Sequence, residues 1–426
     1  MNKKIVSVLL VAAMAFGMTA CGSSENAESG KESGGGDVGG NVGENSGGSV
    51  VNVYVGSDLE GTLDAEIEAY RAVNPDVEIV KHVIPNNDYD DKIKVLLSGG
   101  ADDVDVFWAR TPAFTNQYRT AGALEDLSPY MDQSDVNMES IATELQAVSD
   151  ENGGVYGLPI YSSCWMLFYN KALFDKAGAA YPTGQMTWDE YCELAESLTN
   201  KEGDTQYWGG VCPSWTMNLG AIAAGEYLTG EKPLEKTKEY LEITERMYAK
   251  GHISIEEMNN GSWDLNSCFA NGNVYMMIDG DWGYRDLNCD FEYGTAPLPV
   301  MDGVEEKTSV GNACYYCMAK TATNKQAAYD FMEFATTSDE GTSVTARTGN
   351  VPSYTTEAAM EAYKESVQIE GIDNRFEMTV LPEQSNADNY AAIYEVFKQE
   401  AQLYLLGEES IDECMENFYK LREETE

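Results

Sequence analysis

Strand and helix patterns alternate in the first folded stretch of the chain, and this alternation constrains the fold most strongly. Apolar runs predict buried strands at 51–55 and 104–108, and an alternating pattern predicts another at 77–84. Apolar residues at helical spacing predict helices between these strands, over 63–73 and 89–98. A β-α-β-α-β order requires a mostly parallel sheet with helices on both faces.

The same mixture of strands and helices continues toward the C-terminus. We expect strands at 165–169, 273–278 and 313–319, a capped helix over 188–198, and a final amphipathic helix that starts at Ala391. With 426 residues, and about 150 residues in a typical domain, the chain has room for two or three domains. The sequence therefore predicts an α/β fold with two lobes, between which the chain crosses more than once.

Residues 1–20 are typical of a bacterial secretion signal, because a basic start precedes a short apolar stretch. Met18-Thr19-Ala20-Cys21 resembles a lipobox, in which the cysteine is acylated and becomes the mature N-terminus. Met18 stands where leucine is usual, and the alternative is ordinary cleavage beside an incidental cysteine. Residues 21–50 are rich in Gly and Ser and predict a flexible tether.

Composition excludes several classes of function. The chain has 72 acidic and 27 basic residues, so its net charge of −45 would repel nucleic acids and anionic lipids. Only two histidines, His82 and His252, are present, which excludes a histidine-rich zinc site, and no metal or cofactor is expected. Cys314 and Cys317 lie in an expected strand, on opposite faces, and we interpret them as small buried side chains. We interpret acidic clusters such as 102–105 as solvated loops.

Three side chains follow strands that should end at the same edge of the predicted sheet. Asp58 follows the first strand, and Trp108 and Arg110 end the third. Ligands bind at this edge in α/β sheets. An indole face packs against C–H groups, and carboxylates and guanidinium groups form bidentate hydrogen bonds, as a sugar requires. The alternative is that Trp108 belongs to the core.

A second candidate site lies where the strand at 273–278 ends in a glycine-containing turn. Asp279, Asp281 and Trp282 follow one another there, and we expect the turn to present Trp282. The two carboxylates are expected to form hydrogen bonds or stabilise the turn. A catalytic acid–base pair is the alternative, for which adjacency in sequence is weak evidence. Trp165 and Trp215 are further candidates, as ligand contacts or as core residues.

These features occur together with a series of short motifs in a fixed order. The motifs are Asp105-Val-Phe-Trp-Ala-Arg110, Gly157-Leu-Pro-Ile160, Phe168-Tyr-Asn-Lys171, Thr187-Trp-Asp-Glu190, Met277-Ile-Asp-Gly-Asp-Trp282 and Gly349-Asn-Val-Pro-Ser353. With the lipobox and tether, the set resembles the family 1 extracellular solute-binding proteins of carbohydrate ABC importers, the maltose-binding-protein type. The resemblance covers nearly the whole mature chain.

The resemblance implies a two-lobed, Venus-flytrap fold with a ligand cleft between the lobes and two or three hinge crossings. Each lobe would contain a mostly parallel sheet flanked by helices. The implied boundaries are 51–161 and 314–347 for lobe 1, 165–308 and 353–426 for lobe 2, and 162–164, 309–313 and 348–352 for the crossings.

The resemblance also implies ligand-binding residues. In the maltose-binding type, the tryptophans that match Trp108 and Trp282 stack on sugar rings, and the loop that matches Ser57-Asp58-Leu59 binds sugar hydroxyls. A carboxylate stands there where this chain has Ser163, which argues against maltose, and Arg110 or Asp279 is expected to supply polar groups instead. The complete expected set is Asp58, Leu59, Trp108, Arg110, Tyr161, Ser163, Trp165, Trp215, Asp279, Asp281, Trp282, Asn312 and Arg347.

The implied function is capture of a sugar, expected to be an oligosaccharide, and its delivery by lobe closure to the permease of an ABC importer. The protein would be a monomer without catalytic residues, held outside the cytoplasm by a lipid on Cys21, and the long tether favours a Gram-positive cell surface. Two alternatives remain. One is a non-sugar polar or cationic solute, such as a polyamine, which the acidic charge favours. The other is a glycoside hydrolase, which needs two carboxylates about 5–10 Å apart facing a cleft.

Overall fold

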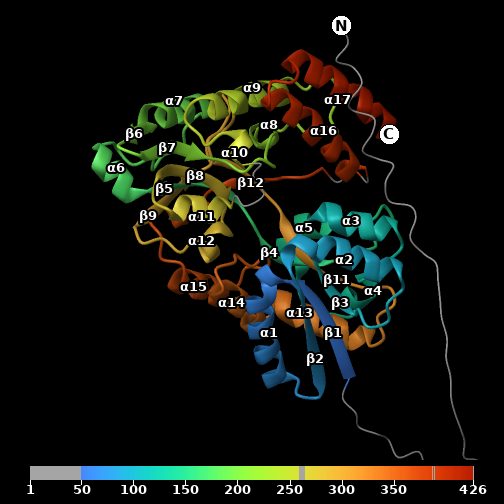
Figure 1. Cartoon of the computed structure of the whole chain (residues 1–426). Helices are drawn as coiled ribbons and strands as arrows, with labels where there is room; N and C mark the ends of the chain where they lie inside the picture. The colour runs from blue at the N-terminus through green and yellow to red at the C-terminus, as the bar shows by residue number, and fades with distance from the viewer. Residues whose placement is uncertain (1–48, 259–263, 386, 388, 426) are drawn as a thin grey trace, which may run out of the picture. The chain divides into compact units, whose positions relative to one another are not determined.

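The computed structural model describes residues 49–258, 264–385, 387 and 389–425. The predicted secretion signal, Cys21 and nearly all of the predicted tether lie outside the described residues. The described chain is built on two five-stranded sheets, here called sheet one and sheet two, and a two-stranded sheet (Figure 1). None of its helices combines the length and the apolar character that a membrane span requires.

Sheet one contains the alternating segment and has the strand order β2-β1-β3-β11-β4. β1 pairs in parallel with β2 and β3, as predicted, but β11 runs antiparallel to both β3 and β4. Because β11 is antiparallel to both neighbours, β1, β2, β3 and β4 all run in the same direction, and the expectation of a mostly parallel sheet is confirmed for sheet one. β11 enters sheet one directly from β10 and not through a covering helix, so the crossover that would make it parallel to its neighbours is absent. The strands are β1 (Ser49–Gly56), β2 (Val77–Ile84), β3 (Val106–Ala109), β4 (Leu158–Ser162) and β11 (Ala313–Met318).

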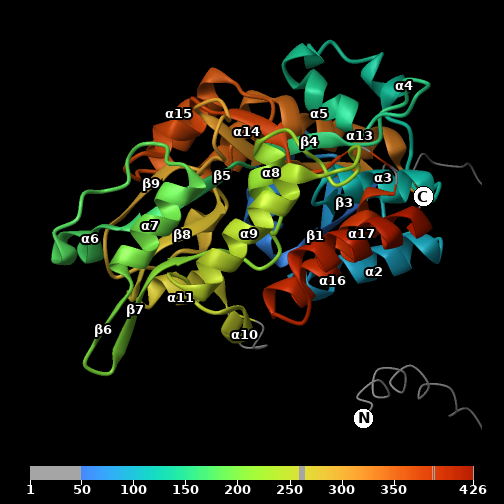
Figure 2. The same cartoon turned by 90° about the horizontal axis from the view of Figure 1, so that it is seen from above.

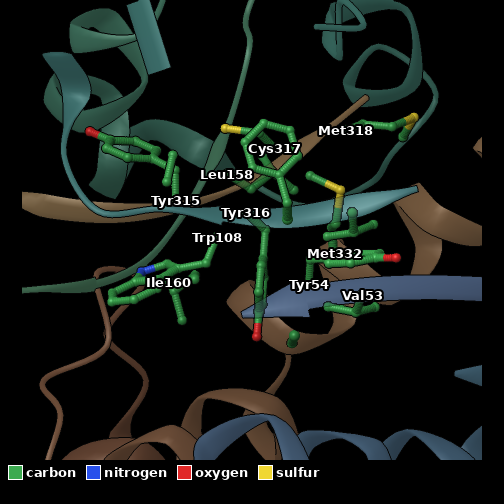
Figure 3. Packing of buried hydrophobic residues seen from close by; sticks show 14 of the residues in the cluster. Val53, Tyr54, Trp108, Leu158, Ile160, Tyr315, Tyr316, Cys317, Met318 and Met332 are labelled. Atoms are coloured by element: carbon green, nitrogen blue, oxygen red, sulfur yellow. The ribbon is translucent and has the colours of Figure 1, made fainter. Parts of the chain in front are cut away.

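Helices pack against sheet one through their apolar sides, as Leu63 and Ile93 show by being fully buried. The core of this half is rich in tyrosine and sulfur, and Figure 3 shows Tyr315 and Cys317 on one face of β11 and Tyr316 on the other. Both Cys314 and Cys317 are buried, as expected. The helices are α1 (Glu60–Val73), α2 (Asn86–Ser98), α3 (Pro112–Thr120), α4 (Ser128–Met131), α5 (Ala142–Ala147) and α13 (Lys325–Thr337).

Sheet two has the strand order β6-β7-β8-β5-β9. In sheet two, β7 and β8 pair in parallel, whereas the other three pairs are antiparallel, so the expectation of a mostly parallel sheet is wrong for this sheet. β5 lies between β8 and β9 and is buried along its whole length. The strands are β5 (Trp165–Asn170), β6 (Asn200–Glu202), β7 (Thr205–Val211), β8 (Val274–Gly280) and β9 (Tyr293–Pro297).

The helices around sheet two follow the capping signals in the sequence. The predicted capping box is confirmed: the Thr187 hydroxyl accepts from the amide of Glu190 at 3.1 Å, and the Glu190 carboxylate accepts from the amide of Thr187 at 2.8 Å. Trp188, which follows the cap, is fully buried. The helices are α6 (Lys171–Ala177), α7 (Trp188–Leu198), α8 (Leu219–Ala223), α9 (Glu235–Ala249), α10 (Ile255–Met258), α11 (Leu265–Ala270) and α12 (Gly283–Asp286).

The C-terminal part adds a two-stranded parallel sheet and four helices. The helix predicted from Ala391 is found, but it is not the last one, because α17 follows and packs beside α16 (Figure 2). The elements are β10 (Thr308–Gly311), β12 (Thr379–Pro382), α14 (Asp339–Arg347), α15 (Glu357–Ser366), α16 (Tyr390–Leu405) and α17 (Ile411–Thr425).

The connections between the sheets lie side by side and are hydrogen-bonded to one another. β4 of sheet one is followed almost directly by β5 of sheet two, and Asn312 separates β10 from β11. The amide of Ser163 donates to the carbonyl of Asn312 at 2.8 Å, and the amide of Ser162 donates to the carbonyl of Val351 at 3.0 Å. These bonds join three segments that are distant in sequence. We call the region formed by Ser162, Ser163, Asn312 and Val351 the junction.

Candidate functional site

Two hollows are lined by residues at or beside the junction. The aromatic pocket has a volume of about 210 Å³, and the junction pocket has a volume of about 290 Å³. The walls of the aromatic pocket include Trp215, Asn218, Glu383, Gln384, Tyr390 and Tyr394. The walls of the junction pocket include Glu144, Ser162, Ser163, Asn312, Arg375 and Val380.

Three aromatic side chains form the apolar part of the aromatic pocket. Tyr390 and Tyr394 lie one turn apart in α16, so their rings stack with centroids 6.1 Å apart and planes at 16°. Trp215 follows β7 and is 46% exposed, which is unusual for a tryptophan, because tryptophans are mostly buried in folded proteins. The hydroxyl of Tyr394 donates to the carbonyl of Trp215 and holds the two walls together. The pocket thus presents flat apolar surfaces to its interior.

Buried polar atoms without partners accompany these rings. The amide nitrogen Nδ2 of Asn218 and the amide oxygen Oε1 of Gln384 are buried, and neither has a hydrogen-bond partner among the described residues. Buried polar groups in folded proteins are almost always hydrogen-bonded. One atom is a donor and the other an acceptor, so an occupant with hydroxyl groups, which donate and accept, could satisfy both.

Glu383 is the acidic group of the aromatic pocket. Its Oε2 accepts hydrogen bonds from Nε1 of Trp165 at 3.0 Å and from Nδ2 of Asn312 at 3.2 Å. No basic side chain pairs with it among the described residues. Burial raises the pKa of Glu383, although the hydrogen bond from Trp165 acts in the opposite direction.

The four residues predicted at the edge of sheet one differ in exposure. Asp58 is exposed, whereas Leu59 is fully buried. Trp108 is 4% exposed and packs in the core of this half (Figure 3). The guanidinium of Arg110 lies 4.8 Å from the Trp108 ring and pairs with Asp90 at 3.3 Å. None of the four is in the walls of the aromatic pocket or the junction pocket.

The turn after β8 is a buried polar cluster. Oδ1 of Asp279 accepts from the amide of Gly280 at 2.8 Å, and Oδ2 of Asp281 accepts from Nε of Arg375 at 2.7 Å. The Asp281 and Arg375 side chains are only 7% and 9% exposed. Trp282 packs edge-on against Trp165, with ring centroids 5.0 Å apart.

The structure brings together several of the remaining candidates at the junction. The Ser163 hydroxyl donates to the carbonyl of Asn312 at 2.9 Å, and Trp165 and Asn312 share the carboxylate of Glu383. Tyr161 is buried in β4 beside them. Arg347 is exposed at the end of α14 and belongs to neither pocket wall. Ligand contact for each of these residues stays a prediction.

One residue of the acidic cluster at 102–105 was interpreted wrongly, whereas Asp102 and Asp103 are exposed as expected. Asp105 is fully buried and not solvated, and it accepts from the amides of Asn52 at 2.8 Å and Thr323 at 2.9 Å. It therefore ties β1 to the segment before α13. In the part of the chain that the structure describes, no three His, Cys, Asp or Glu side chains gather in an arrangement that could hold a metal ion.

Sequence reasoning missed most of the aromatic pocket. Asn218, Glu383 and Gln384 are single polar residues in irregular segments, and nothing in their local sequence distinguishes them. Tyr390 and Tyr394 carried a usable signal, because a spacing of four at the start of a helix places both rings on one face. Their helix was predicted, but only its apolar face was considered.

The chain was compared with known proteins. A family described as bacterial extracellular solute-binding protein matches residues 65–371. A multiple sugar-binding protein of Streptococcus mutans is 23% identical over 310 residues, which cover 66% of this chain and 69% of the relative. A maltodextrin-binding protein of Bacillus subtilis is 22% identical, with coverage of 83% and 81%.

Solved structures share the fold. An ABC substrate-binding protein of Listeria monocytogenes in complex with cycloalternan has a TM-score of 0.78 at 21% identity and covers 88% of this chain and 98% of that one. A maltose-bound protein of Thermotoga maritima has a TM-score of 0.74 at 20% identity, with coverage of 88% and 99%. The two-lobed α/β architecture is therefore that of known binding proteins. Because the family match extends from α1 through both sheets to the segment after α15, the chain belongs to the bacterial extracellular solute-binding proteins.

Proposed function

We propose that the chain captures a sugar for an ABC importer, and that an oligosaccharide is held by the aromatic pocket and the junction pocket. The observation that carries this proposal is the aromatic pocket, where Trp215, Tyr390 and Tyr394 stand beside unpaired polar atoms of Asn218 and Gln384. Aromatic rings pack on the C–H faces of a sugar, and amide groups bind its hydroxyls. The sugar ligands in the names of the two relatives agree with this chemistry.

The proposed mechanism is lobe closure. Sheet one and its helices would form one lobe, sheet two and its helices the other, and the hinge would comprise 162–164, 309–313 and 348–352. An occupant that contacts groups on both sides of the hinge binds the closed arrangement more strongly than the open one, so it shifts the population toward closure. The closed surface is then offered to the importer permease.

The family works outside the cytoplasm. For this chain we further propose a monomer that is anchored to the membrane by a lipid on Cys21, on a Gram-positive cell surface. We propose no enzymatic activity. The paired carboxylates that a glycoside hydrolase needs are not supported by Asp279 and Asp281, because both are buried and Asp281 is paired with Arg375.

A cationic solute is the second candidate, and Glu383 is the observation that favours it. Its half-buried carboxylate has no basic partner among the described residues, so an amine could bind there. Lys398 also lines the aromatic pocket, and its positive charge acts against a cationic ligand.

Thermal unfolding with a ligand panel tests the proposal. The panel contains maltose, mannotriose and cycloalternan, with spermidine and an amino acid for comparison. A ligand at 100 times its Kd adds about 2.7 kcal/mol of stability, which is a clear increase in Tm. Trp215→Ala should abolish the increase, whereas Leu403→Ala, at a side chain of similar exposure (41%) outside the pocket, should retain it. An increase with spermidine alone refutes the sugar ligand, and cleavage of a glycan refutes the absence of enzymatic activity.

A further inference from the structure

The carboxylate of Glu383 belongs to the aromatic pocket and to the junction at the same time. Its Oε2 accepts from Nε1 of Trp165 at 3.0 Å and from Nδ2 of Asn312 at 3.2 Å, and its backbone amide donates to the carbonyl of Gly311 at 2.9 Å. Its Oε1 has no hydrogen-bond partner among the described residues. Oε2 therefore accepts its hydrogen bonds from Trp165 and Asn312, and Oε1 can accept one from a ligand in the aromatic pocket.

The two donors to Glu383 lie on different connections between the sheets. Trp165 begins β5, directly after the connection from β4, and its carbonyl accepts from the hydroxyl of Ser309 at 2.7 Å. Asn312 separates β10 from β11, and its carbonyl accepts from the amide and the hydroxyl of Ser163, at 2.8 and 2.9 Å. Both donors are thus tied to the crossing segments by bonds that do not involve Glu383.

We propose that Glu383 couples occupancy of the aromatic pocket to the arrangement of the two lobes. A ligand hydroxyl that donates to Oε1 fixes the orientation of the carboxylate and withdraws part of the negative charge from Oε2. The bonds from Trp165 and Asn312 to Oε2 change in strength and direction as a result. Hydrogen bonds to a charged acceptor are roughly twice as strong as neutral ones, and a change in these bonds acts directly on the segments of the hinge. The inference rests on the proposed function and names its coupling residue.

The coupling makes an unusual prediction for Trp165, which is 1% exposed and is not in the wall of the aromatic pocket. Trp165→Phe removes the Nε1 donor but retains an aromatic ring against Trp282. It should raise the Kd for mannotriose, or for whichever panel glycan binds, by at least about threefold. In a Glu383→Ala background the same change should have no effect on Kd. Asn218→Ala is the matched pocket variant, and its effect should add to that of Trp165→Phe.

Small-angle scattering of the full chain supplies the conformational readout. With saturating glycan, the wild type and Asn218→Ala should show the same decrease in radius of gyration, and Glu383→Gln should show a smaller one. Gln retains the size of Glu383 and its bonds to the junction, so a lost response cannot be ascribed to unfolding. Equal decreases in all three proteins, or additive effects of Trp165→Phe and Glu383→Ala on Kd, overturn the proposal.

Failure of the proposed function gives a different result. If no panel glycan raises the Tm of the wild type, the sugar assignment fails, and the ligand-free proteins decide the role of Glu383. Glu383→Ala should then change the radius of gyration and shift the indole N–H resonance of Trp165, whereas Asn218→Ala should change neither. An unchanged radius of gyration in Glu383→Ala overturns the coupling role independently of any ligand.

Discussion

The carboxyl of Glu66 is fully buried between α1, β11 and α14, and Glu66→Gln should change the pH dependence of stability near neutrality. Its Oε2 accepts from the hydroxyl of Tyr316 at 2.6 Å, and its Oε1 accepts from the hydroxyl of Thr345 at 3.1 Å. Burial raises the pKa of Glu66 to about 8, although both hydrogen bonds act in the opposite direction. The folded protein therefore holds a proton here that the unfolded chain releases near pH 4.5.

The size of the effect follows from these two pKa values. They differ by about 3.5, which at 1.36 kcal/mol for each tenfold change in acidity is about 5 kcal/mol in total. Because the folded-state pKa of Glu66 is the higher one, the stabilisation is complete below pH 4.5 and is lost as the pH rises through 8. As the pH rises from about 5.5 to about 7.5, ionisation of Glu66 alone lowers the free energy of unfolding by about 2.5 kcal/mol.

His252 acts in the opposite direction. It is 1% exposed, and burial lowers its pKa from 6.5 to about 3, so it stays neutral in the folded protein. Stability from this group is present above pH 6.5 and is lost on acidification, by about 1.4 kcal/mol between pH 7.5 and pH 5.5. With both groups, the wild type should be about 1 kcal/mol more stable at pH 5.5 than at 7.5, from these groups alone, whereas Glu66→Gln should be less stable at pH 5.5.

Urea unfolding of both proteins between pH 5.5 and pH 7.5 measures this difference. Other carboxyls whose pKa is raised, such as Glu144 and Glu400, contribute equally to both proteins and cancel in the comparison. Gln retains the size and neutrality of the protonated acid, so the variant should fold. A difference between wild type and Glu66→Gln that stays constant over this range would show that Glu66 is not protonated in the folded protein.

Three further changes should affect stability, each measured by urea unfolding. Gly209→Ala should lower the free energy of unfolding by at least about 2 kcal/mol, because the new Cβ would lie 1.9 Å from a backbone carbonyl oxygen of α7. Gly184→Ala is its control and should be tolerated, because a Cβ there meets no atom within 4 Å. Arg375→Leu should cost about 3–5 kcal/mol, because it removes the cation that pairs with the buried Asp281, and Asp281→Leu in addition should restore part of the loss. Thr187→Ala removes the capping box and should cost about 1 kcal/mol, and an unchanged midpoint would contradict the role of that cap.

Local signals in the sequence predicted individual elements well. The run at 51–55 became β1, and the helix predicted over 188–198 became α7 with its capping box. Each of these depends on residues a few positions apart. Strand direction does not, because β11 enters sheet one directly from β10 and β5 enters sheet two directly from β4. That is why the expectation of a mostly parallel sheet is confirmed for sheet one and wrong for sheet two, while the order of the elements was predicted correctly.

The candidate site was less predictable because its polar groups acquire their roles only through tertiary contacts. Glu383 lies 218 residues from Trp165 and 71 residues from Asn312, yet one carboxylate oxygen accepts from both. The same reasoning applies to Asp105, which looked like one acid in a solvated cluster. Its partners Asn52 and Thr323 lie 53 and 218 residues away, and these contacts make its burial favourable.

Trp108 shows why an aromatic residue at a strand end cannot be assigned from its position alone. The hydroxyl of Tyr89 accepts from its amide at 3.0 Å and donates to its carbonyl at 2.7 Å, so the backbone is fixed on both sides. A Cβ on Gly56 would lie 2.7 Å from its ring, and the guanidinium of Arg110 stacks 4.8 Å from it. The indole Nε1 nevertheless is buried with no partner among the described residues. The ring therefore packs as a core residue. Its Nε1 donor, however, still lacks an acceptor, which a ligand hydroxyl could supply. Because the Arg110 guanidinium lies over the ring, a sugar that stacks on that side of Trp108 has to displace Arg110.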